Sequence, residues 1–142
     1  MMSCYLDSNV LVYLSNKNSV GYNDAKNILL NLIEMESSIY VSSLVWDEFL
    51  YSIKNLISTS ISDEISKFLR IQYFKTITVS MDVKKVMSIM EEYGLRPRDA
   101  FHFVTAVENK VEYFATFDND FTEVFKKGKL KKFELPFEQS GN

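Results

Sequence analysis

The chain has 142 residues, a length that fits one domain, and we expect a single domain over residues 1–142. A net charge of −3 provides no whole-molecule field that attracts nucleic acid, so any such binding requires local patches. The single cysteine excludes an internal disulfide, and no apolar run approaches the about 20 residues that span a bilayer, which together favour the cytoplasm. The single histidine excludes zinc sites built on several histidines. The catalytic chemistry left to the chain is that of carboxylates.

Segments typical of strands and of helices alternate along the whole chain. The first half predicts a strand at 4–6, a helix at 7–15, an amphipathic helix at 24–36, a strand at 39–41 and a helix from a cap at Ser43 to about 57. The second half predicts a helix from 62 or 63 to about 74, a strand at 76–79 and a helix at 82–93 closed by Gly94. A helix from Pro97 to about 108, a strand at 113–115, a short helix from about 120 and an edge strand at 130–135 follow. This alternation implies an α/β fold with a mostly parallel sheet covered by helices on both faces.

Acidic residues directly follow two of the apolar strands. Asp7 follows the first strand, and Asp118 and Asp120 follow the strand at 113–115. Ligands of open α/β sheets bind at the carboxyl ends of the strands, and carboxylates gathered there repel each other unless a cation lies between them. Each acid also has a plainer explanation, since Asp7 suits an N-cap and Asp120 followed by Glu123 resembles a capping box.

Two further acids lie on helices. Asp99 falls in a first helical turn, where it either joins the acids at the sheet edge or only faces the positive end of the helix dipole. The apolar stripe of the helix from Ser43 consists of Val45, Phe49, Ile53 and Leu56. At about 100° per residue, Glu48 borders this stripe and Asp47 points away from it. Glu48 is therefore the acid that faces the interior, where it joins the other acids or pairs with a buried Lys or Arg.

The combination of acids is more informative than any one of them. Asp7 and Asp118 should share one sheet edge, and four acids with no basic residue among them would be unstable as a purely structural device. Carboxylate oxygens are hard ligands that suit Mg²⁺ or Mn²⁺. Two such ions can activate a water and stabilise the leaving oxygen of a phosphodiester.

Four short motifs carry a resemblance to a known family. They are YLDSNV at 5–10, SSLVWDE at 42–48, LRPRDAFH at 95–102 and ATFDNDF at 115–121. With these motifs, in this order and spacing, nearly the whole chain resembles PIN-domain nucleases, especially the small VapC-type toxins of toxin–antitoxin pairs. The resemblance implies a three-layer fold with a mostly parallel five-stranded sheet between helices.

The resemblance also implies roles for individual residues. The metal-binding and catalytic acids would be Asp7, Glu48, Asp99 and Asp118, with Asp120 as an additional acid of the last motif. Asn9 and Thr116 would orient the carboxylates from behind. The activity implied is Mg²⁺- or Mn²⁺-dependent cleavage of single-stranded RNA by a toxin that forms homodimers and is silenced by an antitoxin.

Three alternatives stay open at this point. The first is a PIN-domain nuclease that processes RNA without an antitoxin, and the second is a PIN-like RNA-binding module without activity, against which the complete set of acids argues. The third is a phosphatase with Asp7 as nucleophile, disfavoured because Asn9 stands where such enzymes usually carry a second Asp.

Several residues near the acids are less specific. His102 could act as a general base, but a lone histidine is more often a satisfied structural partner, and we interpret it as structural. Arg96 and Arg98 flank Asp99 and could hold phosphate. We interpret the lysines near the C-terminus as a solvated face: Lys126, Lys127, Lys129, Lys131 and Lys132. Phenylalanines stand where the family commonly has smaller aliphatic residues, which leaves the shape of the substrate open: Phe101, Phe103 and Phe117.

Overall fold

The centre of the molecule is a parallel β-sheet. The computed structural model describes residues 1–55 and 60–137. Five strands lie in the order β3-β2-β1-β4-β5, and every neighbouring pair is parallel. The strands are β1 (Ser3–Leu6), β2 (Ser38–Ser42), β3 (Phe74–Ile77), β4 (Tyr113–Ala115) and β5 (Lys131–Lys132). The predicted α/β fold with a parallel five-stranded sheet is confirmed.

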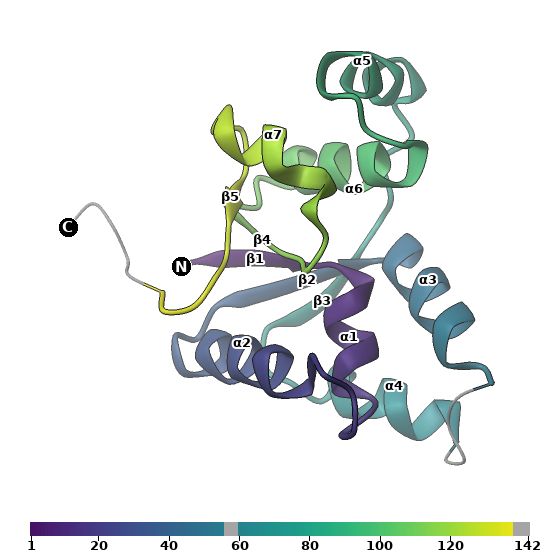
Figure 1. The fold of residues 1–142 in the computed structure, drawn as a ribbon, viewed down its shortest axis with the longest axis vertical. Coiled ribbons are helices and arrows are strands. Elements are labelled where there is room, and N and C mark those ends of the chain that lie inside the picture. The colour runs from purple at the N-terminus through teal and green to yellow at the C-terminus, as the bar shows by residue number, and fades with distance from the viewer. Residues whose placement is uncertain (56–59, 138–142) are drawn as a thin grey trace.

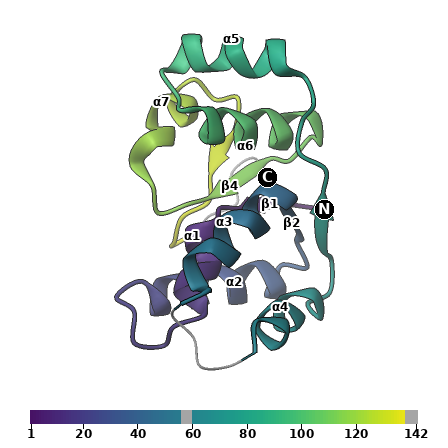
Figure 2. The same ribbon diagram turned by 90° about the vertical axis from the view of Figure 1, so that its right-hand side faces the viewer.

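Helices cover both faces of this sheet and make three layers. They are α1 (Ser8–Leu14), α2 (Tyr22–Glu34), α3 (Ser43–Ile53), α4 (Ile61–Leu69), α5 (Val83–Tyr93), α6 (Pro97–Glu108), the 3-10 turn η1 (Asn119–Phe121) and α7 (Thr122–Lys126). Figure 1 and Figure 2 show α5, α6 and α7 on one side of the sheet and α1 to α4 on the other. Among the described residues, no helix has the length and apolar character needed to cross a membrane.

The two central strands are apolar on both faces because helices cover both. Cys4, Tyr5 and Leu6 of β1 are fully buried, and Tyr113 to Ala115 of β4 are buried as well. The Tyr5 ring stacks on the Phe114 ring of the neighbouring strand, with 5.3 Å between ring centroids. Such continuous apolar strands are typical of parallel sheets. The edge strand β5 instead exposes two lysines, which discourage pairing with another chain.

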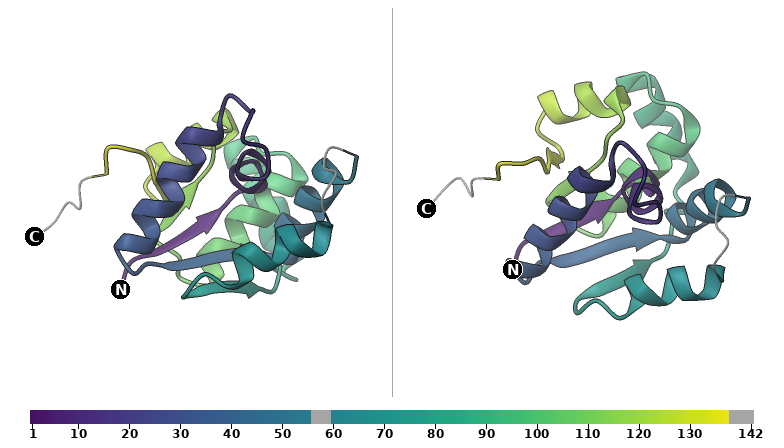
Figure 3. Two further views of the ribbon diagram at one scale, coloured as in Figure 1. Left: turned by 90° about the horizontal axis from the view of Figure 1, so that it is seen from below. Right: turned by 60° about the horizontal axis from the view of Figure 1, so that its bottom comes forward.

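The strand order has a topological switch point beside β1, because the strands that follow β1 in sequence first lie on one side of it and then on the other. The strand that follows β1 in sequence, β2, pairs with one of its edges, and β4 pairs with the other. The backbone N–H of Asp7 still donates to the carbonyl of Ala115 at 2.9 Å, so pairing of β1 with β4 extends as far as the first acid. Figure 3 shows β1 leading directly into α1 at this edge of the sheet. Ligands of open parallel sheets bind at such switch points.

One predicted helix and the strand after it have different bounds. The helix predicted to run to about 74 ends at Leu69, and the strand predicted at 76–79 begins earlier, at Phe74. Phe74 pairs in register with Ile39 of β2, so strand pairing outweighs the helical spacing of its apolar side chain. The predicted edge strand at 130–135 is likewise shorter, at Lys131–Lys132.

Caps also differ from the predictions. α3 is capped by Ser42 rather than Ser43, because the Ser42 hydroxyl accepts a hydrogen bond from the Val45 N–H at 3.3 Å. α3 ends at Ile53 rather than near 57, and Leu56, predicted for its apolar stripe, lies outside the described residues. The predicted end of α5 is confirmed: Gly94 takes a left-handed conformation with φ of 68°, which glycine adopts without strain.

Candidate functional site

A pocket of about 460 Å³ opens at the switch point. The end of β1, α3, the start of α6 and the segment after β4 all contribute to its wall. The lining residues are Asp7, Ser8, Asn9, Glu48, Arg96, Pro97, Arg98, Asp99 and Asp118. The four acids predicted to converge therefore line one pocket, although they lie far apart in the sequence. Asp120 is close to Asp99 and Asp118 but is not among these lining residues.

Asp7 lies deepest of these acids and is held by three neighbours. One carboxylate oxygen accepts the Ser8 N–H at 2.7 Å, and the other accepts the Thr116 hydroxyl at 2.6 Å and the Asn9 amide at 3.4 Å. Burial raises the pKa of the Asp7 carboxyl above its usual value. Neighbouring His102 and the bond from Thr116 oppose this rise, and nearby Glu48 adds to it. Asp7 thus caps α1 and also faces the pocket, so the interpretation as an N-cap and the interpretation as a pocket acid are compatible.

Thr116 and Asn9 connect the first motif with the last. Besides donating to Asp7, Thr116 accepts the backbone N–H of Asp118 at 3.0 Å. Asn9 accepts the N–H of Phe117 at 3.3 Å through its amide oxygen. These bonds fix the chain after β4 relative to the start of α1. Thr116 and Asn9 therefore have the contacts with the acids that the resemblance implies for them.

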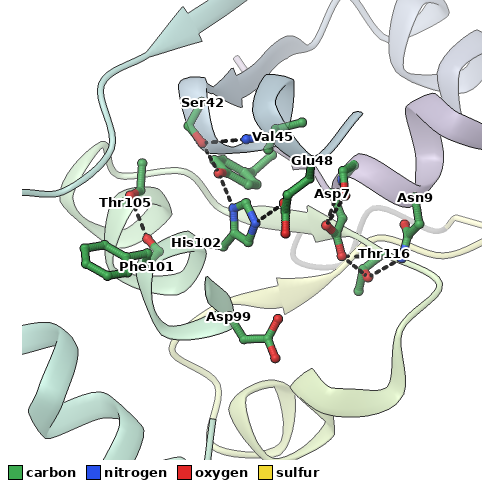
Figure 4. Close-up of polar contacts among 12 residues, drawn as sticks. Asp7, Asn9, Ser42, Val45, Glu48, Asp99, Phe101, His102, Thr105 and Thr116 are labelled. Atoms are coloured by element: carbon green, nitrogen blue, oxygen red, sulfur yellow. Dashed lines mark hydrogen bonds and ion pairs between the residues drawn. The ribbon is translucent and has the colours of Figure 1, made fainter. Parts of the chain in front are cut away.

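Glu48 reaches the pocket from α3, and a buried histidine holds it. Its Oε1 lies 2.7 Å from His102 Nε2, and the His102 side chain is only 1% exposed. Asp47 is exposed to solvent, as the helical spacing predicts. The partner of Glu48 is thus His102 instead of the buried Lys or Arg considered from the sequence. Figure 4 shows the His102 ring between Glu48 and the Ser42 region of the fold.

The histidine is itself bonded on its far side. His102 Nδ1 lies 2.7 Å from the Tyr5 hydroxyl, which lies 2.7 Å from the Ser42 hydroxyl. The contacts of Tyr5 and Ser42 with the site could not be predicted from any motif, since they depend on how β1, β2 and α6 pack. Ligand atoms of Asp7, Glu48 and His102 nevertheless lie within 4.8 Å of one another, close enough to share an ion.

A second acidic group lies beside the first and includes an oxygen without a partner. Ligand atoms of Asp99, Asp118 and Asp120 lie within 4.8 Å of one another. Among the described residues, Asp99 Oδ2 is buried and has no hydrogen-bond partner. Burial raises the pKa of Asp99, Arg96 lowers it, and the charges of Asp118, Asp120 and Asp7 raise it further.

Arg96, which flanks Asp99 in the sequence, contacts the acids, so the premise that no basic residue is interleaved with them is wrong. Arg96 forms an ion pair with Asp120, and its Nε lies 3.6 Å from Asp99 Oδ2, beyond hydrogen-bonding distance. The bond to Asp120 raises the pKa of the Arg96 guanidinium. The Arg96 side chain is 75% exposed, and ion pairs of exposed side chains contribute little to stability. Arg96 therefore balances the outer acids only in part.

The cap after β4 differs from the predicted one. The predicted capping residue was Asp120, but the side chain of Asp118 accepts the Asp120 N–H at 3.0 Å and caps η1. The plainer explanation thus applies to Asp118, although one of its oxygens is enough for the cap. Like Asp7, Asp118 both caps the start of a helical segment and lines the pocket.

The pocket residues fit a hard divalent cation. The acids offer carboxylate oxygens, the donors that such cations prefer. Asp99 Oδ2 has no hydrogen-bond partner among the described residues, and the raised pKa of both Asp7 and Asp99 indicates carboxylates whose burial is only partly compensated by their neighbours. A cation between the two acidic groups would supply that charge.

Three solved structures have a similar fold. A chain of VapBC2 from Rickettsia felis, bound to a DNA fragment from their promoter, matches with a TM-score of 0.67 and 21% identity over 93% of this chain and 98% of that one. A toxin–antitoxin complex from Klebsiella pneumoniae matches with a TM-score of 0.62 and 22% identity over 85% and 92%. VapC20 from Mycobacterium tuberculosis, a sarcin-ricin loop cleaving toxin, matches with a TM-score of 0.65 and 15% identity over 85% and 94%. At these identities the likeness establishes the fold alone.

Sequence comparison identifies the family. A search of curated proteins finds no match to the chain. The model of the PIN domain matches residues 4–127, which is most of the sequence and includes every pocket acid. The family expected from the four motifs is thereby confirmed, and the chain belongs to the PIN domain family.

Proposed function

We propose that this protein is a Mg²⁺- or Mn²⁺-dependent endoribonuclease that cleaves single-stranded RNA and acts as the toxin of a toxin–antitoxin pair. The observation that carries the proposal is the pocket in which Asp7, Glu48, Asp99 and Asp118 meet. Among the described residues, one buried oxygen of Asp99 has no hydrogen-bond partner. Membership of the PIN domain family supports a nuclease. The similar structures of VapBC2, of a toxin–antitoxin complex and of a sarcin-ricin loop cleaving toxin support the proposal that this nuclease is a toxin.

The proposed roles follow from the contacts of each side chain. The metal-binding acids are Asp7, Glu48, Asp99 and Asp118, with Asp120 as an outer acid that Arg96 balances. Thr116 and Asn9 hold the Asp7 carboxylate in place by hydrogen bonds. A divalent cation bound here would lower the pKa of water and offset negative charge on a phosphodiester.

Two arginines at the mouth of the pocket suit the RNA backbone. Arg96 and Arg98 both line it, and both are exposed to solvent. A guanidinium presents a fork of N–H donors that matches a phosphate group. In a protein of net charge −3, we expect this local pair rather than the whole-molecule field to orient the substrate.

The nuclease is tested by a matched pair of substitutions on α3. Glu48→Gln should reduce cleavage of single-stranded RNA in Mg²⁺ or Mn²⁺ by at least about 100-fold, as loss of a key polar group in an active site typically does. Asp47→Asn removes an exposed charge from the residue that precedes Glu48, and this variant should cleave RNA like wild type. Equal losses in the two variants, or full activity in a chelator, would contradict the assignment.

The toxin reading requires a partner and is tested separately. A toxin has to be held inactive, and a basic side chain of a partner placed among the carboxylates would compete with the metal. We expect the product of a neighbouring reading frame to copurify after coexpression and to block RNA cleavage. The proposed homodimer is tested by light scattering after size-exclusion chromatography. If no neighbouring product binds or inhibits, an RNA-processing nuclease without an antitoxin becomes the better reading.

A further inference from the structure

A second cavity lies beside the acid pocket, and the segment that follows β4 contributes to both. This cavity has a volume of about 300 Å³, and its wall comes from α2, from the segment after β4 and from residues 132–135. Figure 1 shows the chain after β5 running towards α2. Thr116 and Phe117 line this cavity, whereas the next residue, Asp118, lines the acid pocket. A ligand in the second cavity is therefore a close neighbour of a ligand among the acids.

Aromatic rings form much of the apolar wall of the second cavity. Phe117 is half-buried and its ring packs against the Tyr13 ring, with 5.2 Å between ring centroids, while Phe133 is almost fully buried. The Phe117 N–H donates to Asn9, whose amide also donates to the Asp7 carboxylate. The Phe117 backbone is thus fixed relative to the deepest acid. A fixed aromatic side chain that is partly open to solvent suits stacking with an unpaired base of RNA.

Charged side chains of both signs line the same cavity. Asp24, Lys132 and Glu134 are exposed to solvent, and Lys132 Nζ lies 3.5 Å from Glu134 Oε2. An N–H donor and a carboxylate acceptor therefore lie side by side next to the aromatic wall. A phosphate group would be repelled by two carboxylates, and a purely apolar ligand would leave all three groups unused. A flat, neutral group with adjacent donors and acceptors fits this lining better than either.

Guanine is the RNA base that matches the lysine and the carboxylate best. Its Watson–Crick edge has the acceptor O6 beside two donor positions, N1 and N2, whereas each of the other three bases has a single donor position on that edge. A lysine can donate to O6 while the two oxygens of one carboxylate accept from N1 and N2. The volume of the cavity is at the small end of the about 300–1,000 Å³ typical of ligand sites, which suits one base rather than a longer segment.

We propose that the second cavity binds a guanine base of single-stranded RNA beside the phosphodiester held at the acids. Phe117 stacks on the base, Lys132 donates to O6, and Glu134 accepts from N1 and N2. The inference rests on the proposed function, because it names the RNA that this nuclease prefers. It also gives a role to Phe117, which left the shape of the substrate open, and to Lys132, which was interpreted from the sequence as part of a solvated face.

The base preference can be measured without cleavage. Fluorescence anisotropy in a chelator compares a short labelled oligouridine that carries one guanosine with the same oligonucleotide carrying adenosine or inosine at that position. Inosine lacks only the N2 amino group of guanosine, and the backbone charge is the same in all three. We expect wild type to bind the guanosine oligonucleotide about 10-fold more tightly than the adenosine one, with inosine between them. Equal affinities, or no binding of any of the three, would overturn the proposal.

Matched variants then assign the recognition to individual side chains. Glu134→Gln should lose most of the guanosine preference. Glu123→Gln removes the same charge from another exposed ion pair, with Lys126 at 3.5 Å, and Glu123 is not among the residues that line the cavity, so this variant should keep the preference. Phe117→Leu removes the ring and should weaken binding of all three oligonucleotides about 10-fold. An unchanged preference in Glu134→Gln would overturn its role even if Phe117→Leu fails to fold.

Failure of this inference and failure of the proposed function give different results. A guanosine preference in binding, without metal-dependent cleavage, would support the guanine site and count against the nuclease. Metal-dependent cleavage of RNA with no preference for guanosine, in binding or next to the cut, would overturn the guanine site and leave the nuclease intact.

Discussion

Removal of the Asp99 charge should stabilise the metal-free protein and weaken its response to a divalent cation. The Asp99 side chain is 13% exposed, and its Oδ2 has no hydrogen-bond partner among the described residues. Burial and the charges of Asp118, Asp120 and Asp7 all oppose its ionisation. Asp99→Asn keeps the size of the side chain and removes the charge, so it tests whether this acid is retained for binding an ion rather than for stability.

The expected magnitude is modest. An unsatisfied buried polar group costs about 1–3 kcal/mol, and the lost ion pair with the exposed Arg96 is worth little. Because the new amide also lacks a partner and the site lies near solvent, we expect a net gain at the lower end, about 1 kcal/mol. An unfolding entropy of about 2.1 cal/mol/K per residue corresponds to about 0.3 kcal/mol per degree for this chain, so Tm should rise by about 3 °C.

Thermal unfolding followed by circular dichroism, first with a chelator and then with Mn²⁺, measures both effects. At an ion concentration about 100-fold above Kd, linkage stabilises wild type by about 2.7 kcal/mol, or about 9 °C in Tm. Asp99→Asn should show little of this increment. Asp47→Asn, on the exposed side of α3, serves as the control and should follow wild type in both conditions. A less stable metal-free Asp99→Asn, or one with the full Mn²⁺ increment, would refute the reasoning.

Three other outcomes follow from the same contacts. Because burial raises the pKa of Asp7 and Asp99, their contribution to folding is favourable at low pH and is lost as pH rises through the raised pKa values. The Tm advantage of Asp99→Asn over wild type should therefore grow from about pH 4 to pH 7. An advantage that stays constant over this range would contradict a raised pKa of Asp99. Thr116→Val removes the hydroxyl that holds the deepest acid and should weaken Mn²⁺ binding in calorimetry about 10- to 100-fold. Thr122→Val loses an exposed hydroxyl that donates to the Asn119 carbonyl and not to an acid, and it should leave Mn²⁺ binding unchanged. His102→Gln can still bond on both sides and should lower RNA cleavage only about 10-fold; a loss of three decades, about 4 kcal/mol of barrier, in a protein with an intact melt would make the histidine catalytic.

The convergence of the acids could be predicted because it follows from topology. Asp7 and Asp118 come directly after apolar strands, and parallel strands deliver such residues to one edge. The phase of α3 separates Glu48 from Asp47 by a simple rotation of about 100°. These inferences need only local pattern and one general rule. Their roles in metal binding remain proposals, but their meeting in one pocket is observed.

Contacts that depend on three-dimensional packing could not be predicted. Tyr5 and His102 are 97 positions apart, and their bond requires β1 and α6 to pack at one particular distance. Arg96 was recognised as a neighbour of Asp99, yet its pairing with Asp120 depends on where the chain turns after β4. Phe74 fits a helical stripe locally, and its pairing with β2 decides its actual conformation. In each case the local pattern was compatible with more than one outcome, and tertiary contacts selected one.

The two halves of the pocket are stabilised in physically different ways. Asp7 and Glu48 are held by hydrogen bonds from buried groups, Thr116 and His102, and moving either acid would leave buried polar atoms unpaired. Asp99, and Asp120 just outside the pocket, are instead balanced in part by Arg96, whose exposed side chain can move at little cost. The inner half is therefore preorganised by the fold, whereas the outer half can adjust its charges to an incoming ion or phosphate. A site built on rigid elements needs its inner ligands fixed most precisely, and the buried donors lie at the inner acids.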